Sequence, residues 1–110
     1  MNLQEAIETI KFHAIDPLGA NLKMRRGENP GMPSLKGLVD ALSCVFGETA
    51  HQNELRRDIA HYCGTFLQFK RDHRIMMKKL PESEYDELIL TLIKVSEKAY
   101  DVLSGLYAGQ

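Results

Sequence analysis

The chain has 110 residues, of which 26% are charged, with 14 Lys and Arg against 15 Asp and Glu. This length suffices for one modest hydrophobic core, so we expect residues 1–110 to form a single domain. The near-neutral charge excludes the overall positive field that nucleic-acid-binding proteins usually carry, and leaves open only a local basic patch.

The cysteines and the amino-terminal sequence bear on the cellular compartment. Cys44 and Cys63 match neither a disulfide framework nor the ligand spacing of a zinc site, which favours a reducing, cytoplasmic setting. Residues 1–14 carry carboxylates where a signal peptide needs a basic start and a long apolar run. No segment offers the roughly 18 uninterrupted apolar residues of a membrane span. We therefore expect a chain that is neither exported by a signal peptide nor inserted in a membrane.

The first predicted helix begins directly after Asn2. The Asn2 side chain is placed to cap it, and Glu5, three positions on, is placed to bond back to a free amide. Phe12 lies opposite the apolar face of this helix, which predicts a second contact. The helix is expected to stop near Asp16, because the residue before Pro17 is disfavoured in the α conformation. The apolar face comprises Leu3, Ala6, Ile7, Ile10 and Ala14.

A short second helix is predicted to start with Asp16 as cap and Pro17 as first residue, and to run to about Arg26. Gly27 is its terminator, and the arginine pair before it stands where the helix dipole favours cations. Residues 27–34, GENPGMPS, hold two prolines and two glycines, and they predict an irregular crossover.

Two further helices are predicted after the crossover. Ser34 is expected to cap the first of them, which closes at Gly47. Its apolar face comprises Leu35, Leu38, Val39, Leu42, Val45 and Phe46. Thr49 and Gln52 then form a T-x-x-Q capping box that starts a long helix running towards Met77. The side chains predicted to face inward on it are Leu55, Ile59, Tyr62, Phe66, Phe69, His73, Met76 and Met77.

Gly64 lies within this long helix, on the flank of its inward face. A glycine there costs about 1 kcal/mol relative to alanine. It therefore predicts a close helix approach or a kink.

The final predicted helix, residues 82–107, is the longest apolar-periodic segment of the chain. Its first apolar stripe comprises Tyr85, Leu88, Leu92, Val95, Ala99, Val102 and Leu106. A second stripe beside it comprises Ile89, Ile93, Tyr100, Leu103 and Tyr107. Together the stripes cover about half of the helix circumference, more than the stripe of about 100° on an ordinary surface helix. Such a helix must contact more than one neighbour, either within one chain or across a symmetric dimer.

These elements predict an all-α four-helix bundle, with an additional short helix in the crossover between the first and the central helix. No run of residues alternates with period two, so no strand is expected. Phe12 outside its stripe and the five methionines favour a homodimer, since flexible thioethers suit adaptable contact surfaces.

A basic cluster lies at the end of the long helix and comprises Lys70, Arg71, Arg74, Lys78 and Lys79. One interpretation is a surface that contacts phosphates, and so a nucleic acid or another polyanion. The interpretation we favour is that cations complement the carboxyl end of one helix while the acidic residues after position 81 complement the start of the next.

Residues 56–61, RRDIAH, place an arginine, four residues and a histidine on one predicted helix. This spacing resembles the motif of the HEPN superfamily, small all-helical proteins, often dimeric, many of which are metal-independent ribonucleases. The resemblance implies that Arg56 binds the scissile phosphate and that His61 is the general acid or base. The family prefers a small polar residue after the arginine, where this chain has Arg57.

The same residues also fit a solvated helix face, on which Asp58 and His61 form an ordinary i, i+3 pair. Positions five apart differ by about 140° on an ideal helix, so Arg56 and His61 converge only with a partner chain or a distorted helix.

The sequence predicts no metal site and no cofactor. Its histidines, cysteines and carboxylates form no HExxH, no paired ExxH and no CxxC motif. His73 lies between Phe69 and Met77 on the inward face, where we favour a hydrogen-bonded core histidine. Neither Cys44 nor Cys63 has a basic neighbour at a spacing that would activate its sulfur.

The leading hypothesis from sequence is a non-enzymatic binding or regulatory protein, a homodimer that acts through a helical surface on an unidentified protein partner. The second stripe of the final helix is the predicted binding surface. The ribonuclease that uses Arg56 and His61 is the alternative, and polyanion binding through residues 70–79 is a further one.

Overall fold

Five helices and one 3₁₀ turn make up the part of the chain that the computed structural model describes, residues 1–46, 53–69, 78 and 81–108. Of residues 53–56 and 106–108 only the helical backbone is described. The elements are α1 (Leu3–Ile15), α2 (Ala20–Arg25), α3 (Met32–Val45), α4 (Asn53–Phe66), η1 (Glu82–Glu84) and α6 (Tyr85–Ala108). These described residues contain no strand, and the predicted all-α helical bundle is confirmed.

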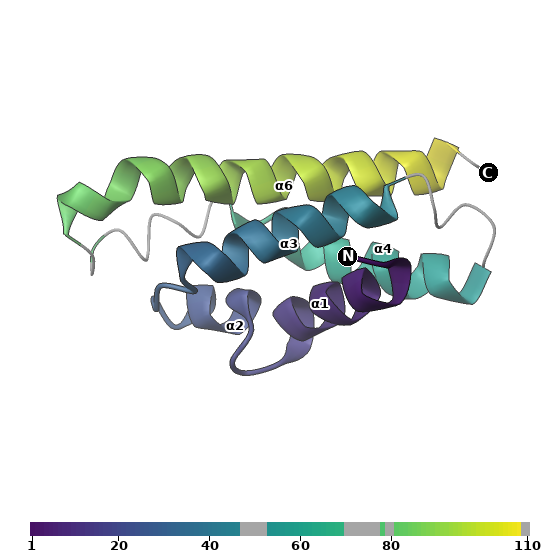
Figure 1. The fold of residues 1–110 in the computed structure, drawn as a ribbon, viewed down its shortest axis with the longest axis horizontal. Coiled ribbons are helices and arrows are strands. Elements are labelled where there is room, and N and C mark those ends of the chain that lie inside the picture. The colour runs from purple at the N-terminus through teal and green to yellow at the C-terminus, as the bar shows by residue number, and fades with distance from the viewer. Residues whose placement is uncertain (47–52, 70–77, 79–80, 109–110) are drawn as a thin grey trace.

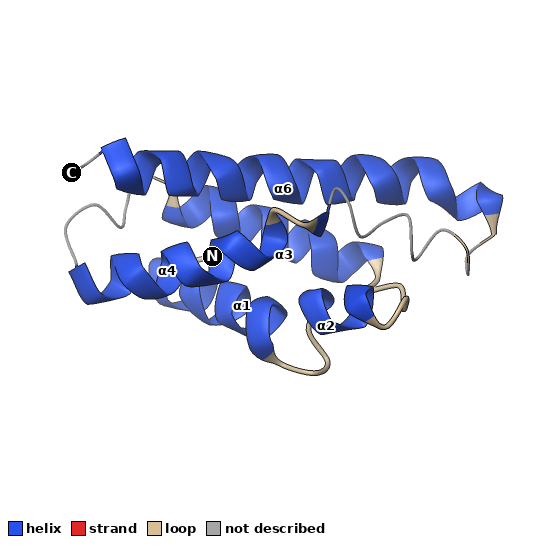
Figure 2. Cartoon of the chain, turned by 180° about the vertical axis from the view of Figure 1, so that it is seen from behind, coloured by secondary structure: helices blue, strands red, loops and turns tan. Residues whose placement is uncertain are grey.

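The four longer helices enclose one core, and the short α2 packs against α1 (Figure 1). Both α1 and α6 pack against α3 and α4, so α6 lies diagonally across the bundle from α1. The view from behind shows α4 running antiparallel to α6 (Figure 2). The prediction that the final helix contacts more than one neighbour is confirmed within a single chain.

The core is built from the predicted inward faces. In α6 the described residues of the first stripe are buried, apart from the half-buried Tyr85. In α4 Ile59 and Phe66 are fully buried, and Phe69 beyond the helix packs edge-on against Phe66 with 5.4 Å between ring centroids. The largest fully buried side chains are Phe66, Phe69, Ile10, Met24, Leu35, Leu38, Leu42, Ile59, Leu92, Val45 and Val95.

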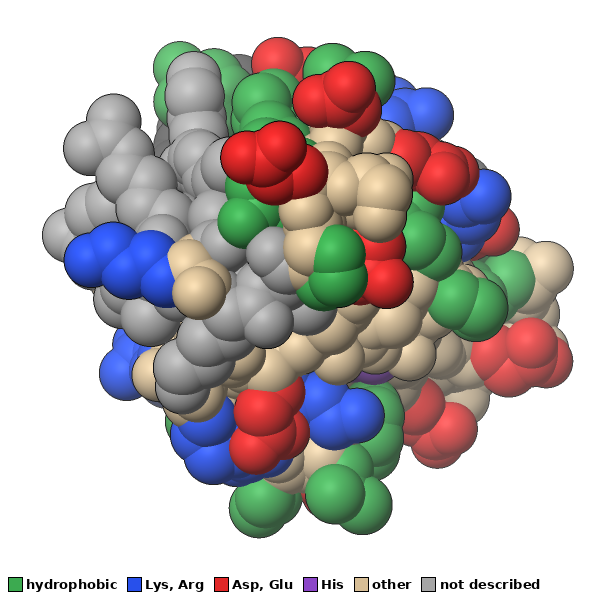
Figure 3. All heavy atoms as spheres, turned by 90° about the vertical axis from the view of Figure 1, so that its left-hand side faces the viewer, with side chains coloured by type: hydrophobic (Ala, Val, Ile, Leu, Met, Phe, Trp, Pro, Cys, Tyr) green, Lys and Arg blue, Asp and Glu red, His purple; other side chains and the backbone are tan. Residues whose placement is uncertain are grey.

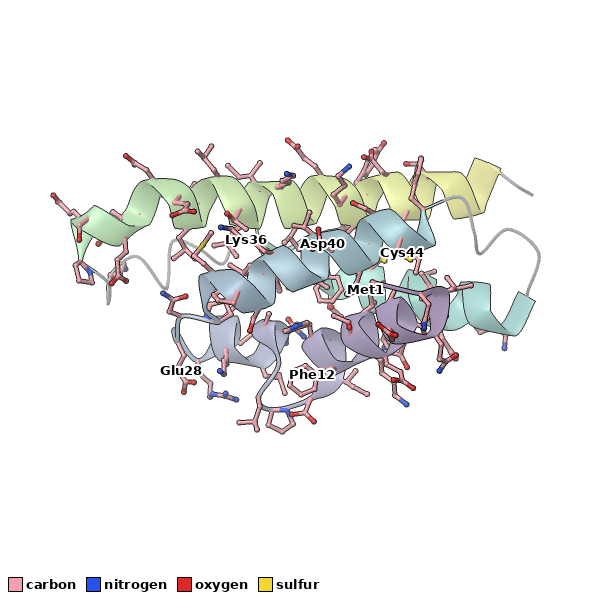
Figure 4. All side chains as sticks on the ribbon, viewed as in Figure 1. Met1, Phe12, Glu28, Lys36, Asp40 and Cys44 are labelled. Carbon is pink, nitrogen blue, oxygen red and sulfur yellow. The ribbon has the colours of Figure 1, made fainter. Side chains whose placement is uncertain are left out.

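Both ends of α1 lie where the sequence predicts them. The Asn2 side chain accepts the predicted hydrogen bond from the Glu5 backbone N–H at 2.8 Å. The Glu5 carboxylate accepts a bond from the Asn2 side chain at 2.8 Å, and not from a free backbone amide as predicted. At the other end Asp16 leaves the helix in an extended conformation, as a residue before Pro17 should. Phe12 points away from the core and is 42% exposed (Figure 4).

The start of α2 is three residues later than the predicted start at Pro17. The Asp16 carboxylate accepts a bond from the Leu18 N–H at 2.9 Å, and the Asp16 carbonyl accepts one from the Gly19 N–H at 2.9 Å. These bonds close a turn in place of a helix start. The predicted terminator is confirmed, because Gly27 has a φ of 73°, which favours glycine.

The start of α3 also differs from the prediction, because Ser34 lies inside the helix. The chain enters α3 through Gly31, whose φ of 89° requires glycine, and Pro33 occupies the first turn, where its missing N–H costs nothing. The predicted inward residue Phe46 is 57% exposed, because α3 ends at Val45. Gly47 and the capping box of Thr49 and Gln52 lie outside the described residues.

The end of α4 departs from the predicted continuous helix towards Met77 at residues 67–68, whereas Phe69 is helical again and residues 70–77 lie outside the described residues. The helix stops at Phe66 and a turn follows at residues 67–68. The Ser96 hydroxyl of α6, buried in the core, donates a 3.0 Å bond to the Phe66 carbonyl. This bond gives a partner to one of the carbonyl groups that a helix leaves free at its carboxyl end. His73 and Met76 lie outside the described residues.

Candidate functional site

The predicted binding surface, the second stripe of α6, is only partly covered by the rest of the chain. Ile89, Ile93 and Leu103 are half-buried, and Tyr100 is 63% exposed. The Tyr107 side chain lies outside the described residues. Tyr100 is the most exposed member of this stripe whose side chain is described.

An apolar groove of about 650 Å³ runs along the seam between α4 and α6, and we call it the α4–α6 groove. It continues past Leu67 and Tyr100 into a second hollow of about 420 Å³ beside Glu97 and Asp101. Leu67, in the turn after α4, is 40% exposed. The groove is lined by Ala60, Gly64, Leu67, Tyr100, Leu103 and Ser104. Two residues of the predicted surface, Tyr100 and Leu103, therefore lie together in it.

The α4 side of the groove is open because its side chains are small. Ala60 and Gly64 are one helical turn apart, so they face the same way. A Cβ atom added at Gly64 would meet nothing within 4 Å outside the α4 backbone. The close helix approach that the sequence predicted at Gly64 is therefore absent, and the glycine leaves open space instead. Sequence reasoning missed Ala60, Gly64 and Leu67 as lining residues, although the small pair one turn apart was a usable signal.

The two rims of the groove carry opposite charge. Around the axis of an ideal α4 helix, the side chains next to the groove-lining face and further from the core are Arg57 and His61. The corresponding side chains on α6 are Glu97 and Asp101. All four of these side chains are exposed. Arg57 places a positive charge on the α4 rim, whereas Glu97 and Asp101 place two negative charges on the α6 rim, with the exposed Lys94 further along the same side of α6.

The proposed ribonuclease pair is described only in part. His61 is exposed on α4 and its ring meets the Tyr62 ring edge-on, with 5.9 Å between centroids. The side chain of Arg56 lies outside the described residues. The resemblance to the HEPN motif therefore stays a prediction.

The cysteines differ in their surroundings. Cys63 is fully buried in the core, and this burial raises the pKa of its thiol to about 12. At neutral pH the sulfur therefore keeps its proton and is a poor nucleophile. Cys44 is half-buried, and its Sγ lies 3.5 Å from the Met1 carbonyl oxygen (Figure 4).

Of the basic cluster the structure describes only Lys78, which is exposed. Lys70, Arg71, Arg74 and Lys79 lie outside the described residues, so the cluster stays a prediction. The end of the bundle where α6 begins shows acidic, basic and apolar side chains interspersed (Figure 3). Here Lys36 of α3 lies 3.6 Å from the Glu87 carboxylate of α6.

Neither a metal site nor a membrane span is found in the described part. Within residues 1–46, 53–69, 78 and 81–108, no three His, Cys, Asp or Glu side chains are grouped so that they could hold a metal ion. No described helix is both long enough and apolar enough to cross a membrane.

Comparison of the chain with protein-family models, with curated proteins and with solved structures gave no significant match.

Proposed function

We propose that this chain is a non-enzymatic protein-binding domain, and that another polypeptide docks in the α4–α6 groove. The observation that carries the proposal is the groove itself. It places the exposed side chains of Tyr100 and Leu67 beside the open space at Ala60 and Gly64. An exposed tyrosine beside a hollow is the arrangement in which one aromatic side chain contributes much of the binding energy at an interface.

The shape of the groove favours a helical partner surface. Grooves between two helices bind the apolar face of a third helix through side chains at i, i+3, i+4 and i+7 spacing. The rim charges of Arg57, Glu97 and Asp101 would then fix the direction and register of that helix. The groove is apolar at its centre and charged at its edge, which is the usual composition of a protein interface.

The test is photo-crosslinking in the cells that make the protein. A photoreactive amino acid replaces Ser104, which lines the groove, and in a matched variant it replaces Glu8, which is exposed on α1. We expect polypeptide adducts from position 104, few from position 8, and loss of the position-104 adducts when Tyr100→Lys is added. Equal labelling from both positions, or adducts that survive Tyr100→Lys, would contradict the proposal.

A further inference from the structure

We infer that the polypeptide in the groove is a second copy of this chain, placed by a two-fold axis that runs parallel to the groove. In this arrangement α6 of each copy lies on α4 of the other, so the helical surface that docks on the groove is the same α4–α6 surface of the partner copy and not a single inserted helix. The inference rests on the proposed binding role of the α4–α6 groove and names the partner that fits it.

The relative heights of the side chains on α4 and α6 follow from one contact. Ser96 bonds to the Phe66 carbonyl, and the two helices run antiparallel (Figures 1 and 2). A residue that lies n positions before Phe66 in α4 therefore stands at the same height as the residue n positions after Ser96 in α6, since each residue rises about 1.5 Å along its helix. Tyr100 stands level with position 62, midway between Ala60 and Gly64.

This register makes the surface complementary to itself. With the axis parallel to the groove, each Tyr100 side chain faces the α4 of the partner copy at its own height. There it meets the open space between Ala60 and Gly64, where a Cβ at Gly64 would touch nothing within 4 Å. A projecting ring thus enters a hollow on both sides of the axis at once, as an isologous interface requires.

The rim charges agree with the same axis. Asp101 stands level with His61, and Arg57 stands about 6 Å further along, within reach of its long side chain. With the axis parallel to the groove, the acidic rim of one copy therefore faces the basic rim of the other. An axis across the groove would instead bring Glu97 and Asp101 next to their own symmetry copies, and would set hollow against hollow. Like charges face to face oppose association, so the charges select the parallel axis.

The first experiment is sedimentation equilibrium of the purified chain at micromolar concentration. We expect about twice the 12.5 kDa chain mass. A monomer at every micromolar concentration would overturn the inference. It would leave the proposed function standing if position-104 adducts to a different protein still formed in cells.

The second experiment fills the hollow. Gly64→Leu should weaken dimerisation at least tenfold, because its side chain occupies the space that Tyr100 of the partner copy needs. The fold should tolerate it, since Gly64 faces open space in the single chain. Gly37→Leu on α3, where an added Cβ also meets nothing within 4 Å, is the matched control and should leave dimerisation unchanged. Circular dichroism checks that both variants are folded, and Tyr100→Lys supplies an independent disruption of the same contact.

The third experiment tests the orientation by charge reversal. Arg57→Asp and Asp101→Arg should each weaken the dimer about tenfold, because each places like charges across the interface. The double variant restores opposite charges and should return to within about threefold of the wild-type dissociation constant. A wild-type dimer that is insensitive to Gly64→Leu and Tyr100→Lys, or a double variant that is as weak as the single ones, would overturn this arrangement.

Discussion

Among single residues, His13 links two helices through one buried ring. The side chain is 6% exposed, and its Nδ1 accepts a 3.1 Å hydrogen bond from the backbone N–H of Ala20, the first residue of α2. Burial lowers the pKa of His13, and the positive charge of Lys23 lowers it further. A protonated Nδ1 could not accept the bond, so α2 keeps this partner only while His13 is neutral.

This arrangement predicts a loss of stability in mild acid. The unfolded chain binds a proton at His13 near the ordinary pKa of 6.5, whereas the folded chain binds it only at lower pH. The stability that His13 contributes is therefore complete above that ordinary pKa, and it is lost as the pH falls through the lowered folded value. We expect the urea midpoint to fall less between about pH 7.5 and about pH 5.5 in His13→Gln than in His61→Gln, which keeps His13. Equal losses in both variants would show that His13 is not responsible.

Gly19 has no room for a side chain. A Cβ there would overlap the Phe12 carbonyl oxygen and stand 2.8 Å from the His13 Cα, both of them backbone atoms of α1. Gly19→Ala should therefore lower the free energy of unfolding by about 1–3 kcal/mol, the usual cost of overpacking. Gly37→Ala has open space and a helical position, so it should raise stability by up to about 1 kcal/mol. Urea titration of the pair measures both changes, and a stable Gly19→Ala protein would refute the close approach.

At the level of helices and turns, the predictions succeed where the signal is local. Asn2 marks the start of α1, Pro17 marks its end, and Gly27 marks the end of α2, because each acts on backbone within a few residues of itself. The end of α4 could not be predicted in this way. Its carbonyl at Phe66 is bonded by Ser96, thirty residues later in the chain. No pattern within α4 announces that partner.

Removing this bond should destabilise the junction of α4 and α6. Ser96→Ala leaves the Phe66 carbonyl without the hydroxyl, and should lower the free energy of unfolding by about 1–3 kcal/mol. Ser104→Ala changes an exposed serine on the same helix and should stay within about 0.5 kcal/mol of the wild type. Chemical denaturation compares the two, and similar small effects would show that the bond contributes little.

For the whole molecule, the width of the apolar arc on α6 predicted correctly that this helix has more than one neighbour. The sequence left open whether the neighbours belong to one chain or two. The structure shows α3 and α4 of the same chain in contact with α6, and it leaves Tyr100 exposed beside the groove. The small pair of Ala60 and Gly64 was a signal for open space on α4, but the groove also depends on the height at which Tyr100 and Leu103 of α6 stand beside that pair. Helical periodicity predicts on which face of a helix a residue lies, but it does not predict the height of that residue relative to a neighbouring helix.

Because α6 packs against both α3 and α4, one core substitution in α6 should affect the stability of the entire bundle. Leu92 is fully buried, so Leu92→Ala should cost about 2–5 kcal/mol and lower the unfolding midpoint in a single cooperative transition. Leu90, 68% exposed on the same helix, is the control, and Leu90→Ala should change stability by less than about 0.5 kcal/mol. Separate transitions for different helices, followed by circular dichroism and tyrosine fluorescence, would argue against a shared core.

The burial of Cys63 has a practical consequence for anyone who handles this protein. A thiol-modifying reagent in native buffer can reach that sulfur only during the rare moments when the helices separate. In a Cys44→Ser variant, the rate of chemical labelling at Cys63 therefore measures how often these openings occur. Variants with substitutions in the α4–α6 groove could then be ranked by how often the core of each variant opens transiently, without any denaturant.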